Sequence, residues 1–288
     1  MKISLLGTGL MGAPMAIKLA GAGYEVTAYN RTPEKLEPLE KIGINTTSNI
    51  LEIMQFADCL ILMLTDVEVI KKVILTEETK KHLDNKTIIQ MGTIAPSHSK
   101  AIHQEIVSLG GEYLEAPVLG SIPQVKDGTL LVMVGATPQQ FNYYLDLLKN
   151  FGPEPMLIGE VGSAATVKLA MNQLIGSLTT AFALSLGLVQ KEGIEIDKFM
   201  DILRGSALYA PTFDKKLLRM VEGNFSNPNF PSKHLLKDMN LFCAEASSLG
   251  LDVSLVEAVS KVVQKALDLG LANEDYSALF AAVNPQEG

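Results

Sequence analysis

The chain has 288 residues, of which 47% are apolar and 19% charged, so it can bury a large core and is not disordered as a whole. Its net charge of −8 argues against general nucleic-acid binding, which needs a basic surface, although a local basic pocket can still hold a small anion. Cys59 and Cys243 are the only cysteines and form no CxxC motif, which excludes a disulfide framework and fits a reducing, cytoplasmic compartment.

The first half of the chain alternates strand and helix patterns. Short apolar runs predict strands at 2–6, 25–29, 59–64, 87–90, 113–116 and 130–134. Amphipathic patterns predict helices at 11–22, 32–42, 96–109 and 138–150. Because the first strand pattern begins at Lys2, we expect no signal peptide. Alternation of this kind predicts an α/β fold with a doubly wound, parallel sheet of the Rossmann type.

The second half of the chain carries almost only helix signals. They lie at 162–191, 197–204, 212–222, 231–249, 252–270 and 275–283. The apolar stretch 169–189 includes several polar side chains, so we interpret it as a core helix of a soluble protein and not as a membrane span. We therefore expect a dinucleotide-binding Rossmann domain at 1–161 and an all-helical domain for substrate binding and oligomerisation at 162–288, joined by a long helix.

The stretch GTGLMG at 7–12 follows the first strand pattern and opens the first helix pattern. In a dinucleotide-binding fingerprint, Gly7 permits a tight turn, Gly9 lets the backbone approach phosphate, and Gly12 lets the helix pack on the strand. A flexible glycine turn without a ligand is the alternative, but strand, helix and second strand are all in register. We therefore expect the pyrophosphate of a cofactor to lie against six residues: Gly7, Thr8, Gly9, Leu10, Met11 and Gly12.

The second strand pattern ends at Asn30, where NAD-binding sites often place an acidic residue that accepts from the ribose hydroxyls. Arg31 offers a planar donor fork suited to phosphate, and the Thr32 hydroxyl adds a donor. These three residues favour NADPH over NADH. The alternative is that Arg31 is an ordinary solvated side chain.

Lys168 lies in the otherwise apolar helix pattern GSAATVKLAMNQ, with Asn172 four residues later on the same face. A lysine in such surroundings is costly to bury without a partner or a purpose. Beside a nicotinamide it could donate a proton to a carbonyl oxygen and stabilise the developing alkoxide, with Asn172 orienting substrate or lysine. The alternative, that Lys168 extends to water from a partly exposed helix, stays open on spacing alone.

A set of motifs along the whole chain resembles the β-hydroxyacid dehydrogenase family. The motifs are GTGLMGAPMA, NRT at 30–32, EAPVLGS at 115–121, DGTL at 127–130, GSAATVKLAMN at 162–172 and KDMNL at 237–241. FPSKHLLKDMNL at 230–241 and LGLANEDYSALFAAV at 269–283 are similar to the glyoxylate/succinic semialdehyde reductase branch.

This resemblance implies roles for individual residues. Lys168 matches the catalytic lysine and Asn172 an asparagine that helps to hold substrate. Leu64, Thr93 and Lys237 are expected on the cofactor, with Lys237 closing over it from the helical domain. The expected substrate-binding residues are Gly120 and Ser121, in a loop that binds carboxylate, together with Phe230 and Asp238. Alternatively, Phe230 has a plain packing role and the Lys237–Asp238 pair is a surface ion pair.

Two positions depart from the family pattern, because Leu119 and Gly92 stand where the family commonly has serine. Both departures leave the proton donor intact but put the particular substrate in doubt. The four histidines are scattered and form no HxxxH or Cys/His cluster, so we expect no metal site.

Taken together, the residues and the resemblance predict an NADPH-dependent reductase of small carboxylated aldehydes such as glyoxylate and succinic semialdehyde. Alternatives on the same fold are a 3-hydroxyisobutyrate-type dehydrogenase or an imine reductase, the latter disfavoured by Lys168. A more distant alternative is a non-catalytic NADP-binding module. We expect a homodimer or homotetramer with no nucleic-acid or membrane partner.

Overall fold

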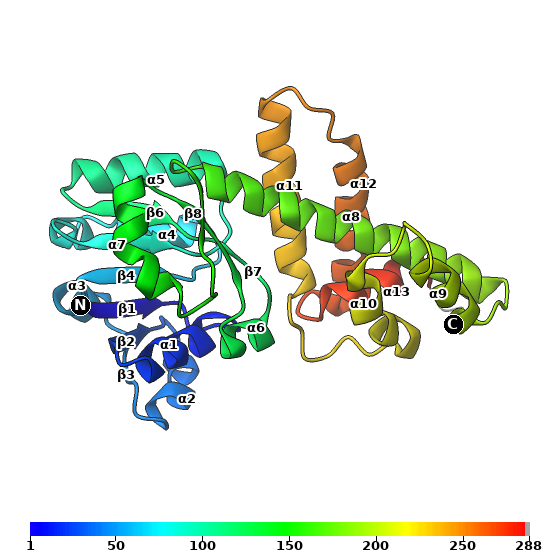
Figure 1. Ribbon diagram of the computed structural model, residues 1–288, viewed down its shortest axis with the longest axis horizontal. Helices are drawn as coiled ribbons and strands as arrows, with labels where there is room; N and C mark the ends of the chain where they lie inside the picture. The colour runs from blue at the N-terminus through cyan, green and yellow to red at the C-terminus, as the bar shows by residue number, and fades with distance from the viewer. Residues whose placement is uncertain (286–288) are drawn as a thin grey trace. The chain divides into compact units, whose positions relative to one another are not determined.

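The computed structural model describes residues 1–285. The chain divides into two compact units, an N-terminal unit, Met1–Lys168, and a C-terminal unit that starts at Leu169 (Figure 1). The division falls within helix α8 (Ser163–Lys191), which runs without a break from one unit into the other.

The N-terminal unit contains a nine-stranded sheet. Its strands are β1 (Lys2–Leu6), β2 (Glu25–Tyr29), β3 (Asn45–Thr47), β4 (Cys59–Leu62), β5 (Thr87–Gln90), β6 (Glu112–Glu115), β7 (Val118–Leu119), β8 (Leu131–Gly135) and β9 (Met156–Gly159). The first six are parallel in the order β3-β2-β1-β4-β5-β6, and β8 then pairs antiparallel with β6 and β7. This is the doubly wound order of a Rossmann fold, so the predicted fold class is confirmed.

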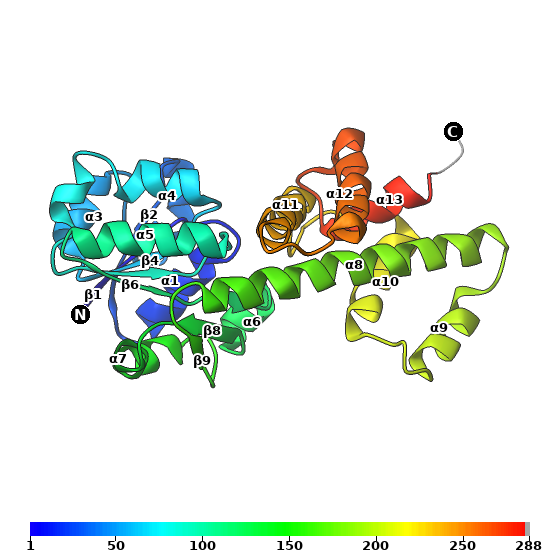
Figure 2. The same cartoon turned by 90° about the horizontal axis from the view of Figure 1, so that it is seen from above.

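Helices cover both faces of this sheet. They are α1 (Gly12–Gly21), α2 (Glu37–Glu40), α3 (Ile50–Phe56), α4 (Val67–Ile74), α5 (Pro96–Ser108), α6 (Ile122–Asp127) and α7 (Pro138–Leu148). Strand side chains alternate between two cores: Leu5 packs in the core that contains α1 and α7, whereas Leu6 packs in the core that contains α3, α4 and α5. Figure 2 shows α3, α4 and α5 together on one face of the sheet and α7 on the other.

The prediction of one continuous helix at 32–42 is wrong, because this segment forms two separate short elements. A short 3₁₀ turn, η1 (Pro33–Lys35), is followed by the one-turn helix α2. Pro38 lacks an N–H and its ring would clash with the carbonyl four residues earlier, so one helix cannot run through it. The predictions also missed β3, β7, β9, α3, α4 and α6, all of them eight residues long or shorter. Such segments are too short to show a clear hydrophobic period.

Between Leu169 and Val283 the regular elements of the C-terminal unit are helices joined by short loops, as predicted. After α8 come α9 (Ile196–Arg204), α10 (Pro211–Glu222), α11 (Ser232–Ser248), α12 (Ser254–Ala266), the short turns η3 (Leu267–Leu271) and η4 (Tyr276–Ala278), and α13 (Leu279–Val283). Figure 1 shows α11 and α12 side by side. At Gly176 in α8, an added Cβ would lie 2.8 Å from Met239 Sδ in α11, so glycine permits a close approach of these two helices.

By length and composition alone, α8 is long and apolar enough to cross a bilayer, with a mean hydropathy of 1.3 in its most apolar window. In that window 44% of the residues are buried inside the protein. Core helices of soluble proteins satisfy the same criterion, so this property does not assign a location.

Candidate active site

The glycine loop after β1 leaves an open cradle at one of its three glycines. Gly7 has φ +100°, and a Cβ there would lie 2.5 Å from the Met63 carbonyl oxygen. A Cβ on Gly12 would collide with the Gly7 carbonyl oxygen, whereas one on Gly9 would meet nothing within 4 Å. Gly7 and Gly12 are thus required by packing, and the open space over Gly9, beside the N-terminus of α1, fits a pyrophosphate group.

Asn30 fastens the segment after β2 to this glycine loop. Its Nδ2 donates to Thr8 Oγ1 at 2.9 Å, and its Oδ1 accepts from the Thr32 backbone N–H at 3.0 Å. Thr8 Oγ1 in turn donates to the Lys35 carbonyl oxygen at 3.2 Å. Asn30 therefore holds the loop that presents Arg31 and Lys35, both exposed. Sequence reasoning did not identify Lys35. Its position four residues after Arg31 could have indicated a second basic side chain in this segment.

The expected cofactor residues Leu64 and Thr93 follow the carboxyl ends of the neighbouring strands β4 and β5. Between these two segments a Cβ on Gly92 would collide with the Leu64 carbonyl oxygen. The Gly92 carbonyl accepts from Gln90 Nε2 at 3.1 Å. In this chain a side chain at position 92 would therefore need a shift of the Leu64 backbone. Ligands of doubly wound sheets bind outside such strand ends.

The loop expected to hold a carboxylate begins at Gly120, with φ +136°, where a Cβ would lie 2.6 Å from Leu130 Cδ2. The backbone N–H and the hydroxyl of Ser121 both donate to Gln124 Oε1, at 2.9 and 2.8 Å. Ser121 thus fixes the start of α6, and its hydroxyl must turn away from Gln124 to donate to a substrate. Leu119 pairs with Leu131 in the edge ladder β7–β8.

Lys168 lies in the second turn of α8 and is only 9% exposed, and Asn172, one turn later, is 2% exposed. The lysine side chain is therefore largely buried. Residues four apart in a helix share one face, so Lys168 and Asn172 project from the same face of α8.

Within the C-terminal unit, Asp238 in α11 holds Asn172. Asn172 Nδ2 donates to Asp238 Oδ2 at 2.6 Å, and Lys237 Nζ lies 3.0 Å from Asp238 Oδ1. Asp238 is 1% exposed, whereas the Lys237 side chain is 25% exposed, so the ion pair joins a buried carboxylate to a partly exposed ammonium. Because the Asn172 nitrogen faces a carboxylate, its Oδ1 is the atom available to accept hydrogen bonds from other groups.

Phe230 lies just before α11, with its ring centroid 6.5 Å from that of His234 and 5.8 Å from that of Tyr276. Its carbonyl accepts from the Tyr276 N–H at 2.9 Å, so its backbone is fixed. Burial, together with the charges of Lys237 and Lys233, lowers the pKa of His234. His234 is therefore neutral at pH 7 and does not serve there as a cationic acid.

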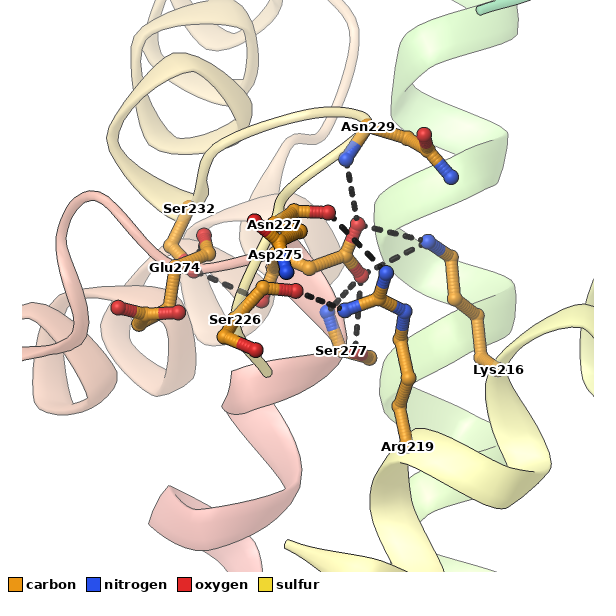
Figure 3. Close-up of polar contacts among 9 residues, drawn as sticks. All are labelled: Lys216, Arg219, Ser226, Asn227, Asn229, Ser232, Glu274, Asp275 and Ser277. Atoms are coloured by element: carbon orange, nitrogen blue, oxygen red, sulfur yellow. Dashed lines mark hydrogen bonds and ion pairs between the residues drawn. The ribbon is translucent and has the colours of Figure 1, made fainter. Parts of the chain in front are cut away.

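A buried ion pair fixes the segment that leads to Phe230. Lys216 Nζ lies 2.7 and 2.9 Å from the two oxygens of Asp275, which also accept from the Ser277 and Asn229 N–H groups (Figure 3). Arg219 donates to the carbonyls of Ser226 and Asn227. Figure 3 shows these groups converging from α10, the 226–232 segment and the 274–277 segment. The sequence analysis did not identify this network.

Sequence reasoning assigned no role to Glu115, although this residue begins the motif EAPVLGS at 115–121. Glu115 is buried at the end of β6 and accepts hydrogen bonds from the backbone at the start of α8, the helix that carries Lys168. Its visible signal was an acidic residue in an otherwise apolar strand. Among residues 1–285, no three His, Cys, Asp or Glu side chains gather in a way that could hold a metal ion.

Known proteins resemble this chain over nearly its whole length. Residues 2–161 match the model described as the NAD binding domain of 6-phosphogluconate dehydrogenase, and residues 162–283 match NAD-binding of NADP-dependent 3-hydroxyisobutyrate dehydrogenase. Glyoxylate/succinic semialdehyde reductase 1 of Arabidopsis thaliana is 30% identical over 285 residues, covering 98% of each chain. The 2-hydroxy-3-oxopropionate reductase of Escherichia coli is 31% identical over 288 residues, covering 98% of this chain and 97% of that protein.

A solved structure of 3-hydroxyisobutyrate dehydrogenase from Mycobacterium tuberculosis, with L-serine, has a TM-score of 0.87 to this chain at 22% identity, over 98% of each chain. That likeness supports the fold. The sequence matches extend over both units and include the glycine loop and the helix that carries Lys168. The protein thus belongs to the β-hydroxyacid dehydrogenase family of NAD(P)-dependent oxidoreductases.

Proposed function

We propose that this protein is an NADPH-dependent reductase that converts small carboxylated aldehydes, such as glyoxylate or succinic semialdehyde, to hydroxy acids, with Lys168 as proton donor. The observation that carries the proposal is the burial of Lys168 one turn before Asn172 on α8. The names of the relatives above support this substrate class.

In this proposal the glycine loop and the segment after β2 bind the cofactor, and Lys168 acts on the substrate. Gly7, Gly9 and Gly12 hold the pyrophosphate of the cofactor, and Arg31 with Thr32 binds its 2′-phosphate. Bound NADPH supplies the hydride that reaches the carbonyl carbon of the substrate. The Lys168 ammonium donates to the carbonyl oxygen, stabilises the negative charge that develops there, transfers its proton to give the hydroxyl, and is reprotonated from solvent.

Two further contacts orient the substrate. The Asn172 Oδ1, left available because Nδ2 donates to Asp238, accepts from the Lys168 ammonium or from the new hydroxyl. The Gly120 backbone N–H and the Ser121 hydroxyl, once that hydroxyl has turned away from Gln124, bind the substrate carboxylate.

Substitution of Lys168 tests the proposal. Lys168→Ala should lower kcat by about 100-fold or more, the usual contribution of a general acid, while NADPH binding stays within about twofold. Lys168→Arg keeps the charge but is a very weak acid, so it should recover little of the lost turnover. Lys191→Ala, at the exposed end of the same helix, is the matched control and should be normal. Unchanged turnover in Lys168→Ala would reject the assignment.

A 3-hydroxyisobutyrate-type dehydrogenase is the second candidate, favoured by the family model that matches residues 162–283. A substrate panel separates the two candidates. Glyoxylate and succinic semialdehyde are assayed with NADPH, and 3-hydroxyisobutyrate is assayed with NADP⁺. Higher kcat/KM for the aldehydes supports the reductase, and higher kcat/KM for the branched hydroxy acid supports the dehydrogenase.

Self-association is a further part of the proposal. In the C-terminal unit, α8 carries exposed leucines at 174, 178, 184 and 188. Exposed apolar side chains along one helix are typical of a surface that is covered by another subunit. We expect a dimer or a tetramer in light scattering, and a monomer would contradict it.

A further inference from the structure

A buried carboxylate stands at the end of β6 in the N-terminal unit. Glu115 is the last residue of that strand and is only 1% exposed. An added Cβ at Gly135, on the neighbouring strand β8, would collide with Glu115 Oε1. The fold therefore makes room for this carboxylate by keeping a glycine beside it.

One oxygen of Glu115 accepts three backbone hydrogen bonds from the start of α8. The donors are the N–H groups of Gly162 at 2.8 Å, Ala164 at 2.8 Å and Ala165 at 3.1 Å. These N–H groups have no carbonyl partner within the helix, and the positive end of the helix dipole favours a negative charge at this place. Glu115 therefore fastens the first turn of α8 to the sheet.

The second oxygen of Glu115 is fixed by α5. Ser99 Oγ donates to Glu115 Oε2 at 2.6 Å and lies 2.8 Å from the Tyr113 hydroxyl. Since the single Ser99 proton is directed to the carboxylate, Tyr113 is the donor in the second contact. Both oxygens of Glu115 are thus held, and the carboxylate cannot rotate freely.

Lys168 follows closely on this anchor. It lies three residues after Ala165, which corresponds to about 4.5 Å along an α-helix. A carboxylate that holds three N–H groups of one turn fixes both the height of the helix above the sheet and its rotation about its own axis. The position of the Lys168 ammonium relative to the strand ends depends on both.

We propose that Glu115 is a positioning residue for the reaction: it anchors the start of α8 to β6 and so sets the place from which Lys168 donates its proton. This inference rests on the proposed function, in which Lys168 is the acid. Misplacement of a catalytic group by about 1 Å can lower a rate by about 100-fold.

The test compares Glu115→Ala, Glu115→Gln and Lys168→Ala with the double variant Glu115→Ala/Lys168→Ala. Glu112→Ala, an exposed glutamate on the same strand, is the matched control. The readouts are kcat and KM for glyoxylate at saturating NADPH, the NADPH Kd from cofactor fluorescence, and hydrogen exchange of residues 162–168.

We expect Glu115→Ala to lower kcat by about 10- to 100-fold, with the NADPH Kd within about twofold and faster exchange at 162–168. Glu115→Gln keeps an acceptor oxygen at the same place and should retain more of kcat. In the Lys168→Ala background, Glu115→Ala should lower kcat by no more than about twofold, because the group it positions is already gone.

An equal fold-loss of kcat in both backgrounds would overturn the inference, and so would normal kcat despite faster exchange at 162–168. A normal Lys168→Ala variant would instead reject the proposed function, whatever Glu115 does. If Glu115→Ala does not fold, Glu115→Gln and Ser99→Ala replace it in the same cycle. In that case, losses of kcat confined to the background that retains Lys168 support the inference, and equal losses in both overturn it.

Discussion

Asn30 donates a hydrogen bond from Nδ2 to the Thr8 hydroxyl at 2.9 Å, which joins the end of β2 to the glycine loop. An aspartate at position 30 could not donate to Thr8 and would place a negative charge beside the expected 2′-phosphate. We therefore expect Asn30→Asp to lower kcat/KM for NADPH by about 10- to 100-fold, which corresponds to the free energy of one hydrogen bond to a charged group. The kcat/KM for NADH should fall much less, because NADH has no 2′-phosphate.

The control for this substitution is Asn45→Asp, which adds the same charge at an exposed position on β3. Steady-state kinetics with both cofactors give the ratio of kcat/KM values. If Asn30→Asp leaves the NADPH to NADH ratio as it is in the wild type, the 30–35 segment does not select the cofactor.

Asp238→Asn is expected to lower kcat because it removes the charge that orients Asn172 and pairs with Lys237. A hydrogen bond to a charged group contributes about 1.5–3 kcal/mol, which corresponds to about 10- to 100-fold in rate if it is lost in the transition state. Asp197→Asn, at an exposed position in α9, is the control. Turnover of Asp238→Asn within twofold of the wild type would show that Asn172 needs no such support.

Gly92→Ser is expected to destabilise this protein. The new side chain would collide with the Leu64 carbonyl oxygen, and overpacking of this kind costs about 1–3 kcal/mol. Gly21→Ala, in a helix with nothing within 4 Å of the new Cβ, should be neutral or stabilising by about 0.5–1 kcal/mol. Urea unfolding of both variants measures the difference, and a fully stable Gly92→Ser would contradict the packing explanation.

Sequence reasoning succeeded where the signal is local. The apolar runs that form β1, β2, β4 and β5, the glycine loop and the helices of the second half are all visible as short-range patterns. Glu115 was missed because its partners at 162–165 are 47 to 50 residues away and meet it only through the sheet topology. The close contact at Gly92 was missed for the same reason. It is made with the Leu64 carbonyl, 28 residues earlier in the chain, and no local pattern reveals it.

Asn30 shows an intermediate outcome. The sequence identified position 30 because it lacks the acidic residue that NAD-binding sites often have there. The structure adds that the Asn30 amide nitrogen donates to the Thr8 hydroxyl and that its oxygen accepts from the Thr32 backbone N–H. The residue type was informative, but the contacts depended on how the segment after β2 folds back on the loop after β1.

The buried pair of Lys216 and Asp275 predicts a strong difference between single and double substitution. Asp275→Asn leaves the Lys216 ammonium buried without its carboxylate, which costs about 3–5 kcal/mol. Lys216→Met/Asp275→Asn removes the buried charge as well and should cost less than Asp275→Asn alone. Urea unfolding measures both. A double variant as unstable as the sum of its single variants would show that the two side chains do not interact.

Titration of Glu115 gives a prediction for stability against pH. Burial raises the pKa of Glu115, although hydrogen bonds from Ser99 and from the N–H groups of Ala165, Gly162 and Ala164 oppose the shift. Between the ordinary pKa of a glutamate and this raised value, the folded protein binds more protons than the unfolded chain. Its free energy of unfolding therefore decreases as the pH rises through that window.

Glu115→Gln cannot titrate, so it lacks this contribution. We expect the free energy of unfolding of the wild type, relative to Glu115→Gln, to fall as the pH rises from the ordinary glutamate pKa and to level off above the raised one. Glu112→Gln, exposed on the same strand, should show no such trend. Urea unfolding at a series of pH values gives the comparison. A relative stability that increases with pH would mean that the hydrogen bonds from α8 and Ser99 outweigh burial, and that the carboxylate is favoured in its charged form.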